Sequence, residues 1–75
     1  MQAEVAILYR KSPRTAWEFI TYAVNQAVGE RSADSTLTQQ RALGDKHGEV
    51  IVVEREAYDA GSITKLYKAK ERTTS

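Results

Sequence analysis

Residues 3–10 form the first patterned stretch of the chain, because apolar side chains recur at every second position. A period of two is typical of a β-strand, whose successive side chains point to opposite faces. The second set of positions is also half apolar, so we expect a strand inside a sheet or one covered in part on both sides. The two sets are Ala3, Val5, Ile7 and Tyr9, and Glu4, Ala6, Leu8 and Arg10.

The next stretch has the three- and four-residue spacing of an amphipathic helix. Two start signals precede it, the pair Ser12-Pro13 and a capping box at Thr15-Ala16-Trp17-Glu18, and Gly29 is suited to end it. We predict a helix from about Pro13 or Ala16 to Val28, with its apolar stripe lying on a sheet. The stripe consists of Ala16, Trp17, Ile20, Ala23, Val24, Ala27 and Val28.

Residues 30–48 are open to two interpretations because they contain few apolar side chains. Asp34 or Ser35 can cap a short helix that runs through Leu43, or Thr36–Ala42 can form a strand. The good helix formers near position 40 favour the helix.

The last patterned stretch predicts a β-hairpin. Residues 50–53 are a β-branched run, and Tyr58-Asp59-Ala60-Gly61-Ser62 has the form of a three-residue loop with a left-handed glycine bulge. This loop gathers apolar groups on one face, whereas a two-residue loop would place Val53 beside Lys68. The predicted pairs are Ala57 with Ile63, Arg55 with Lys65, Val53 with Tyr67 and Ile51 with Ala69, and the other face carries Glu54, Glu56, Thr64, Lys68 and Lys70.

Together these elements predict a small two-layer α+β domain in the order β-α-(short helix or strand)-β-β. One main helix packs on a three- or four-stranded, largely antiparallel sheet and leaves no room for an active-site cavity. We expect residues 1–71 to form a single domain and residues 72–75 to be a flexible C-terminal tail. The sheet residues expected beneath the helix are Val5, Ile7, Val53, Ile63 and Tyr67.

The composition narrows the class of protein. The chain has 75 residues, 41% hydrophobic and 28% charged, which is ordinary for one folded domain, and its net charge of +1 indicates no partner. The absence of cysteine excludes disulfides, thiol nucleophiles and cysteine zinc sites. No apolar run is long enough to span a bilayer, and the first residues lack the order of a signal peptide. We therefore expect a cytoplasmic protein without membrane contact.

Candidate catalytic groups are few. His47 is the single histidine, and its position between glycines is typical of a solvated turn. Glu54 and Glu56 alternate along a strand and could pair an acid with a base in a cleft, but nearby lysines of the predicted hairpin favour surface charge pairing. The glycines are scattered and form no phosphate-binding loop. We predict no enzyme activity, no metal site and no cofactor.

One candidate binding surface is basic. Lysines and arginines interleaved with Tyr67 on a β-ribbon can follow a phosphate backbone while the ring stacks on a base. The alternative interpretation is that edge-strand lysines only prevent strand pairing, and that neighbouring acids dilute the field unless the two signs segregate. The nucleic-acid-binding candidates are Arg10, Lys11, Arg14, Lys65, Lys68, Lys70 and Arg72.

The other candidate surface is the outer side of the predicted helix. Phe19, Tyr22 and Gln26 lie there, and large rings at a rim are the residue types that anchor protein interfaces. Alternatively, the two rings only close the edge of the core. A small domain without catalytic groups works by presenting a surface, so we predict a binding or regulatory protein that docks onto another protein, with nucleic-acid binding as the alternative. An open sheet edge also permits a homodimer.

The chain is similar in size, and in its lack of a catalytic site, to small accessory proteins of phages and mobile elements that inhibit or redirect a host protein. No motif carries this similarity, so it implies only a type of function.

Overall fold

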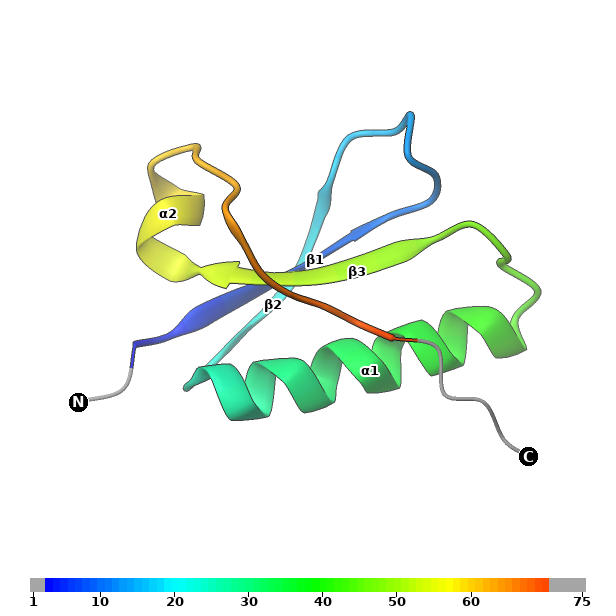
Figure 1. Cartoon of the computed structure of the whole chain (residues 1–75), viewed down its shortest axis with the longest axis horizontal. Helices are drawn as coiled ribbons and strands as arrows, with labels where there is room; N and C mark the ends of the chain where they lie inside the picture. The colour runs from blue at the N-terminus through cyan, green and yellow to red at the C-terminus, as the bar shows by residue number, and fades with distance from the viewer. Residues whose placement is uncertain (1–2, 71–75) are drawn as a thin grey trace.

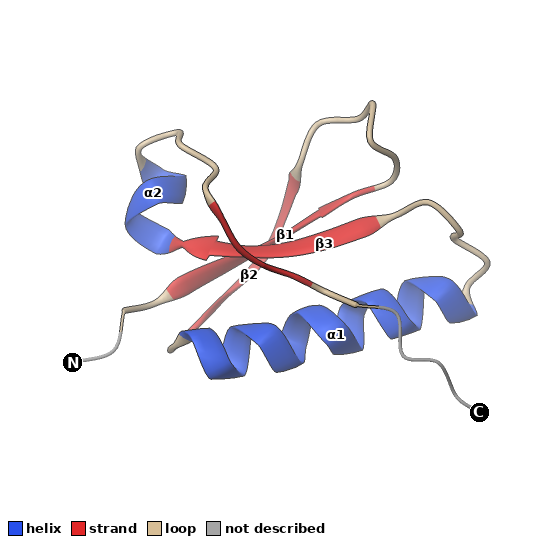
Figure 2. Ribbon diagram, in the orientation of Figure 1, coloured by secondary structure: helices blue, strands red, loops and turns tan. Residues whose placement is uncertain are grey.

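The computed structural model describes residues 3–70, which form one four-stranded sheet with a long helix on one face (Figure 1). The strand order is β2-β1-β3-β4, and every neighbouring pair is antiparallel (Figure 2). This confirms the predicted α+β class, with one main helix on an antiparallel sheet. The expected tail at residues 72–75 lies outside the described residues. The elements are β1 (Val5–Arg10), β2 (Glu18–Ala23), α1 (Gln26–Ala42), β3 (Glu49–Glu54), α2 (Arg55–Asp59) and β4 (Lys65–Lys68).

Strand β1 is a central strand, as its pattern predicts. It pairs with β2 on one side and β3 on the other. Its side chains from residue 5 to residue 8 are all buried, although they point alternately to the two faces. Both faces of the sheet are therefore covered at this strand.

The helix predicted from residue 13 or 16 to residue 28 is wrong. Ser12 and Thr15 close a tight turn, in which the Thr15 amide donates to the Ser12 carbonyl at 3.1 Å, and the chain then returns as β2. Strand β2 contains Phe19, Ile20, Thr21 and Tyr22, and aromatic and β-branched side chains suit a pleated surface better than a helix.

Helix α1 begins where the predicted helix should end. The side chain of Asn25 accepts a hydrogen bond from the Val28 amide at 2.9 Å and caps the first turn. Gly29 lies inside the helix and does not end it. The helix favoured near position 40 is confirmed as the second half of α1, which excludes the strand alternative for Thr36–Ala42. Gly44, with a φ of 98°, follows the helix.

A β-bulge in β2 decides which side chains share a face. Ile7 pairs with Thr21 and Leu8 pairs with Phe19, so Ile20 is an extra residue between them. Because of this extra residue, Phe19 and Tyr22 point to the same face of the sheet although they are three positions apart. Trp17 and Ala23, which were predicted to share one helical stripe, pack on opposite faces of the sheet, so their helical spacing does not reflect a single apolar stripe.

The predicted hairpin at residues 50–69 has the wrong turn and register. Residues 55–59 form the short helix α2, and only the left-handed Gly61, with a φ of 82°, is as predicted. The strands pair Val52 with Tyr67 and Ile51 with Lys68, and a second irregularity follows at Val53. This shift places Tyr67 with the helix-facing side chains and turns Val53 to the opposite face, because a slip of one residue inverts a strand. Ile63, also expected in the core, is 44% exposed.

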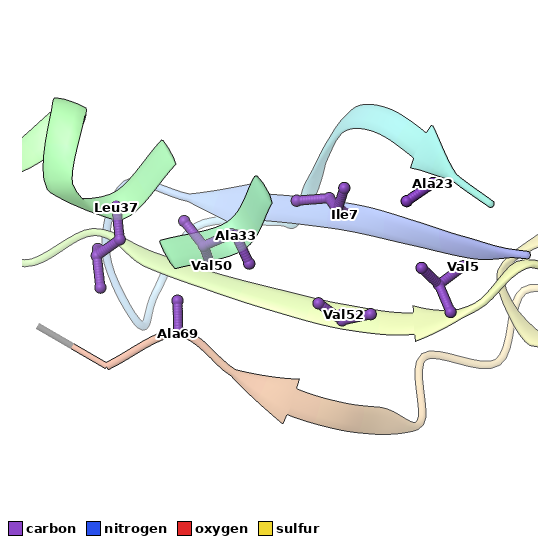
Figure 3. Packing of buried hydrophobic residues seen from close by; sticks show 8 residues of the cluster. All are labelled: Val5, Ile7, Ala23, Ala33, Leu37, Val50, Val52 and Ala69. Atoms are coloured by element: carbon purple, nitrogen blue, oxygen red, sulfur yellow. The ribbon is translucent and has the colours of Figure 1, made fainter. Parts of the chain in front are cut away.

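The main core lies between α1 and the sheet (Figure 3). Helix α1 buries only a narrow stripe, Gly29, Ala33 and Leu37, at a spacing of four residues. A Cβ atom on Gly29 would lie 2.5 Å from Cγ2 of Val5, so glycine allows the helix to approach the sheet closely here. The sheet side chains in this core are Val5, Ile7, Ala23, Val50, Val52 and Ala69, with Tyr9 and Tyr67 at its border.

A second apolar layer lies on the opposite side of the sheet, which we call the open face. Ala6, Leu8, Ile51 and Val53 are buried there. Trp17, which was predicted to belong to the apolar stripe of a helix, covers this layer from the open face together with Tyr58 of α2. Within residues 3–70 the cover consists of these side chains and α2, with no second long helix.

Candidate functional site

Three rings form an exposed aromatic cluster on the open face, which comprises Phe19 and Tyr22 of β2 and Tyr58 of α2. The centroids of Phe19 and Tyr22 are 4.7 Å apart, and Phe19 and Tyr58 stack at 5.4 Å with an interplanar angle of 27°. Phe19 is 42% exposed and Tyr22 is 37% exposed, so much of the cluster faces solvent. The cluster joins segments far apart in the sequence and depends on the bulge at Ile20.

Arg55 lies beside the aromatic cluster, and its positive charge is paired with carboxylates. Its guanidinium lies 4.1 Å from the ring centroid of Tyr22 and 2.9 Å from a carboxylate oxygen of Glu4, and Asp59 is 3.8 Å away. The hydrogen bond to Glu4 raises the pKa of Arg55 further. Partial burial, followed by the charge of Asp59, raises the pKa of Tyr22, so this phenol stays protonated. The positive charge beside the rings is therefore paired with two carboxylates.

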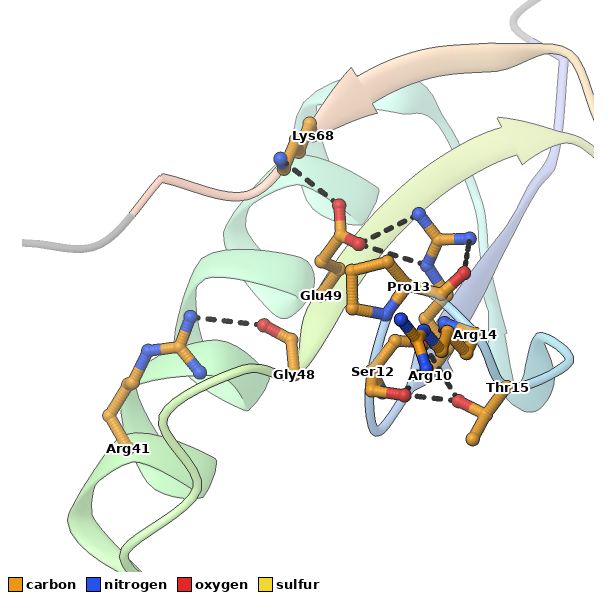
Figure 4. Close-up of polar contacts among 9 residues, drawn as sticks. All are labelled: Arg10, Ser12, Pro13, Arg14, Thr15, Arg41, Gly48, Glu49 and Lys68. Carbon is orange, nitrogen blue, oxygen red and sulfur yellow. Dashed lines mark hydrogen bonds and ion pairs between the residues drawn. The ribbon is translucent and has the colours of Figure 1, made fainter.

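The same arrangement of a ring and an arginine occurs where β1 ends. Arg10 lies 4.2 Å from the ring centroid of Trp17 and 2.7 Å from the carboxylate of Glu49. Lys68 reaches the other oxygen of Glu49 at 3.0 Å (Figure 4). Hydrogen bonds from Lys68 and Arg10 lower the pKa of Glu49. One carboxylate thus holds two cations at the border of the open face.

A hydrogen-bonded lock fixes the loop between α1 and β3, residues 43–48. The Tyr9 hydroxyl donates to Asp45, and Asp45 also accepts from the amides of Gly48 at 2.8 Å and His47 at 3.1 Å. Arg41 donates to the carbonyls of Asp45 and Gly48, each at 3.0 Å. Five hydrogen bonds with donors in three segments hold this short loop, on which Lys46 and His47 are exposed.

The lock makes stability depend on pH at both extremes. The hydrogen bond to Asp45 raises the pKa of Tyr9 to about 12, and the same bond lowers the pKa of Asp45. The stabilisation from Tyr9 is complete below its unfolded pKa and is lost as pH rises toward 12, whereas that from Asp45 is lost as pH falls below its unfolded pKa. We expect Tyr9→Phe to lower the midpoint of thermal unfolding at neutral pH and to lose this effect in acid. An equal effect of Tyr9→Phe at neutral and acid pH would contradict the lock.

The structure brings together only part of each predicted site. Phe19 and Tyr22 are neighbours, but they lie on a strand of the open face and not on the outside of a helix, which corrects the prediction. Gln26 is the first residue of α1, on the other layer, where it donates to Glu30 at 2.8 Å. Tyr58, Arg55 and Trp17 were missed, because the first two were assigned to a hairpin and the third to the core.

The basic candidates gather at one end of the molecule, with two exceptions. Lys65 begins β4 and therefore lies at the opposite end of the sheet, and Arg72 lies outside the described residues. The others lie where β1 and β4 end, and the loop that carries Lys46 joins them there (Figure 1). The gathered candidates are Arg10, Lys11, Arg14, Lys68 and Lys70.

No acid–base constellation is formed by the groups considered in the sequence. His47 precedes β3, whereas Glu54 ends that strand and Glu56 lies in α2, so the histidine is at the opposite end of the sheet from both carboxylates. Among residues 3–70 no group of three or more metal-ligating side chains lies close enough together to hold a metal ion. None of the helices in this part of the chain is long and apolar enough to cross a bilayer.

Comparisons of the chain with family models, with curated proteins and with solved structures gave no match.

Proposed function

We propose that this chain is a non-catalytic binding protein that docks onto another protein through the open face of the sheet. The observation that carries the proposal is the exposed aromatic cluster of Phe19, Tyr22 and Tyr58, flanked by arginines that are already paired with carboxylates. Tyrosine, phenylalanine and arginine are the residue types enriched at the centres of protein interfaces.

The orientation of the rings favours a protein over nucleic acid at this face. Bases stack on free ring faces, but Phe19 and Tyr58 stack on each other and Arg55 covers a face of Tyr22. A phosphate backbone would also need unpaired cations, whereas Arg10, Arg55 and Lys68 all have carboxylate partners. Exposed ring edges beside arginines that are paired with carboxylates suit the mixed apolar and polar groups of a protein surface.

The aromatic cluster is also well ordered for binding. Phe19 and Tyr22 are fixed by a strand in the sheet, and Tyr58 belongs to a helix that follows directly on β3. The Tyr22 hydroxyl donates to Asp59 at 3.4 Å, which further limits its rotation. Side chains held in place before binding lose little conformational entropy when a partner covers them.

The double variant Phe19→Ala/Tyr22→Ala tests the proposal. We expect the partner affinity to fall about 30-fold or more, because interface hot spots cost about 2 kcal/mol or more when truncated to alanine. The partner is first captured from extract with the wild-type chain after nuclease treatment, and its affinity is then measured by calorimetry.

The matched control removes comparable apolar surface from the other layer. Val28 and Leu43, 40% and 75% exposed, lie on α1 and at its end, so Val28→Ala/Leu43→Ala should leave affinity unchanged. Circular dichroism of both double variants checks that each is folded before affinities are compared. Equal capture by the aromatic variant and the control would place the interface elsewhere and refute the proposal.

A further inference from the structure

The fold concentrates positive charge at one end of the molecule. Strands β1 and β4 end there, β2 and β3 begin there, and α1 ends there, so three separate segments contribute cations (Figure 1). We call this the basic end, and its segments are residues 10–14, residues 41–47 and residues 68–70. Its cations are Arg10, Lys11, Arg14, Arg41, Lys46, Lys68 and Lys70.

The net charge of +1 conceals this polarisation. Among the described residues, four carboxylates, Glu18, Asp34, Asp45 and Glu49, accompany the seven cations of the basic end. The far end of the sheet has the opposite composition, with two cations, Arg55 and Lys65, among four carboxylates. Positive and negative side chains therefore gather at opposite ends of the molecule. Nucleic-acid binding was predicted to depend on such a separation, because neighbouring acids would otherwise weaken the attraction for phosphates. The carboxylates of the far end are Glu4, Glu54, Glu56 and Asp59.

Three of the carboxylates at the basic end are already engaged. Asp34 accepts from the Tyr67 hydroxyl at 3.0 Å and from the Lys70 amide at 3.3 Å. Asp45 accepts the hydrogen bonds of the loop lock, and Glu49 is shared by Arg10 and Lys68. Four exposed cations have no carboxylate within ion-pair distance in the described part of the chain. They are Lys11, Arg14, Lys46 and Lys70.

The surface between these cations is hollowed into two grooves that meet at Lys46 and His47. One groove, of about 650 Å³, is bordered by Lys46, Lys68 and Lys70. The other, of about 670 Å³, is bordered by Lys11, Ser12 and Thr15. Hydroxyl groups, lysine and arginine are the side chains that contact phosphate oxygens in protein–DNA complexes.

From this geometry we infer a second site, in which the basic end binds the sugar-phosphate backbone of a nucleic acid without reading its sequence. The excess of cations over carboxylates, the four cations without an ion-pair partner and the grooves all fit a chain of regularly spaced phosphates. The site uses side chains other than the aromatic cluster, so the same molecule can hold a protein and a nucleic acid together. The loop lock positions Lys46 for this contact.

The salt dependence of binding tests the inference. Fluorescence anisotropy with a labelled duplex of about 20 base pairs, and with its separate strands, gives the affinity between about 50 and 200 mM salt. Four phosphate contacts predict a slope of about −3 to −4 in log affinity against log salt, or a loss of about 100-fold over this range. Lys46→Ala/Lys70→Ala should reduce the slope by about 2 and the loss to about tenfold.

A charge-matched control separates local contacts from net charge. Arg31→Ala/Lys65→Ala removes the same total charge from exposed positions outside the basic end and should leave most of the slope intact. No binding at low salt, equal losses in both double variants, or binding to poly-glutamate in place of nucleic acid would overturn the inference. Loss of nucleic-acid binding only in Phe19→Ala/Tyr22→Ala would also overturn it, and would move the nucleic acid to the open face. If Phe19→Ala/Tyr22→Ala keeps its affinity for nucleic acid, the nucleic-acid site does not depend on the protein-binding site, and each proposal can be refuted without the other.

Discussion

Replacing Leu37 with alanine should lower the free energy of unfolding by about 2 to 5 kcal/mol, the range for truncating a buried leucine. Leu37 is 2% exposed and is the largest side chain that α1 buries against the sheet. The rest of the buried stripe is Gly29 and Ala33, so no neighbouring helix side chain is large enough to fill the cavity. A chain of 75 residues is stable by only about 4 to 11 kcal/mol, so the variant should unfold in much less urea.

The same substitution six positions later provides the control. Leu43 follows the last residue of α1 and is 75% exposed, so Leu43→Ala should change stability by less than about 0.5 kcal/mol. Urea unfolding followed by circular dichroism measures both variants. Similar losses for Leu37→Ala and Leu43→Ala would mean that α1 packs with a different face on the sheet.

The parts of the fold that could be predicted are those with a strong local pattern. Strand β1 alternates over six residues, and its half-apolar second face correctly indicates a central strand. The α+β class follows because one long helix and an antiparallel sheet are the simplest way to bury the apolar segments. These inferences need no knowledge of which residues meet across the sheet.

The main helix was misplaced because residues 16–28 have apolar side chains at helical spacing although residues 18–23 form a strand. The apolar residues at helical spacing belong to two faces of the sheet, since Trp17 packs on the open face and Ala23 packs under α1. The true helix, Gln26–Ala42, buries a stripe of mostly small residues and has little apolar periodicity. The strand composition of residues 18–23 was the available signal against a helix.

The candidate site was found only in part, because it depends on long-range register. Phe19 and Tyr22 were chosen from their residue types, which was sufficient to mark them as neighbours on a surface. Tyr58 and Arg55 join them only because residues 55–59 form α2, where a hairpin was expected. The segregation of charge likewise follows from strand order, which local sequence does not determine.

Gly29 is the position where a substitution should most directly test how α1 meets the sheet. A Cβ atom there would lie 2.5 Å from Cγ2 of Val5 and 3.2 Å from Cγ1 of Val52. Both valines are β-branched and stiff, and both are buried in β1 and β3, so neither can move aside at little cost. The interface therefore has no space for a larger residue.

We expect Gly29→Leu to destabilise the fold by about 1 to 3 kcal/mol or more, because overpacking outweighs the gain of about 1 kcal/mol in helix propensity over glycine. Ala27→Leu, on the exposed side of the same turn, should be nearly neutral. Urea unfolding measures both, and the double variant Gly29→Ala/Val5→Ala should lose less stability than the sum of its single changes, because a smaller residue 5 relieves the clash. Additive losses in that cycle would show that Gly29 does not contact Val5. The strand carrying Val5 also carries Ala6 and Leu8 beneath the open face, so displacement of α1 would disturb the layer that supports the aromatic cluster.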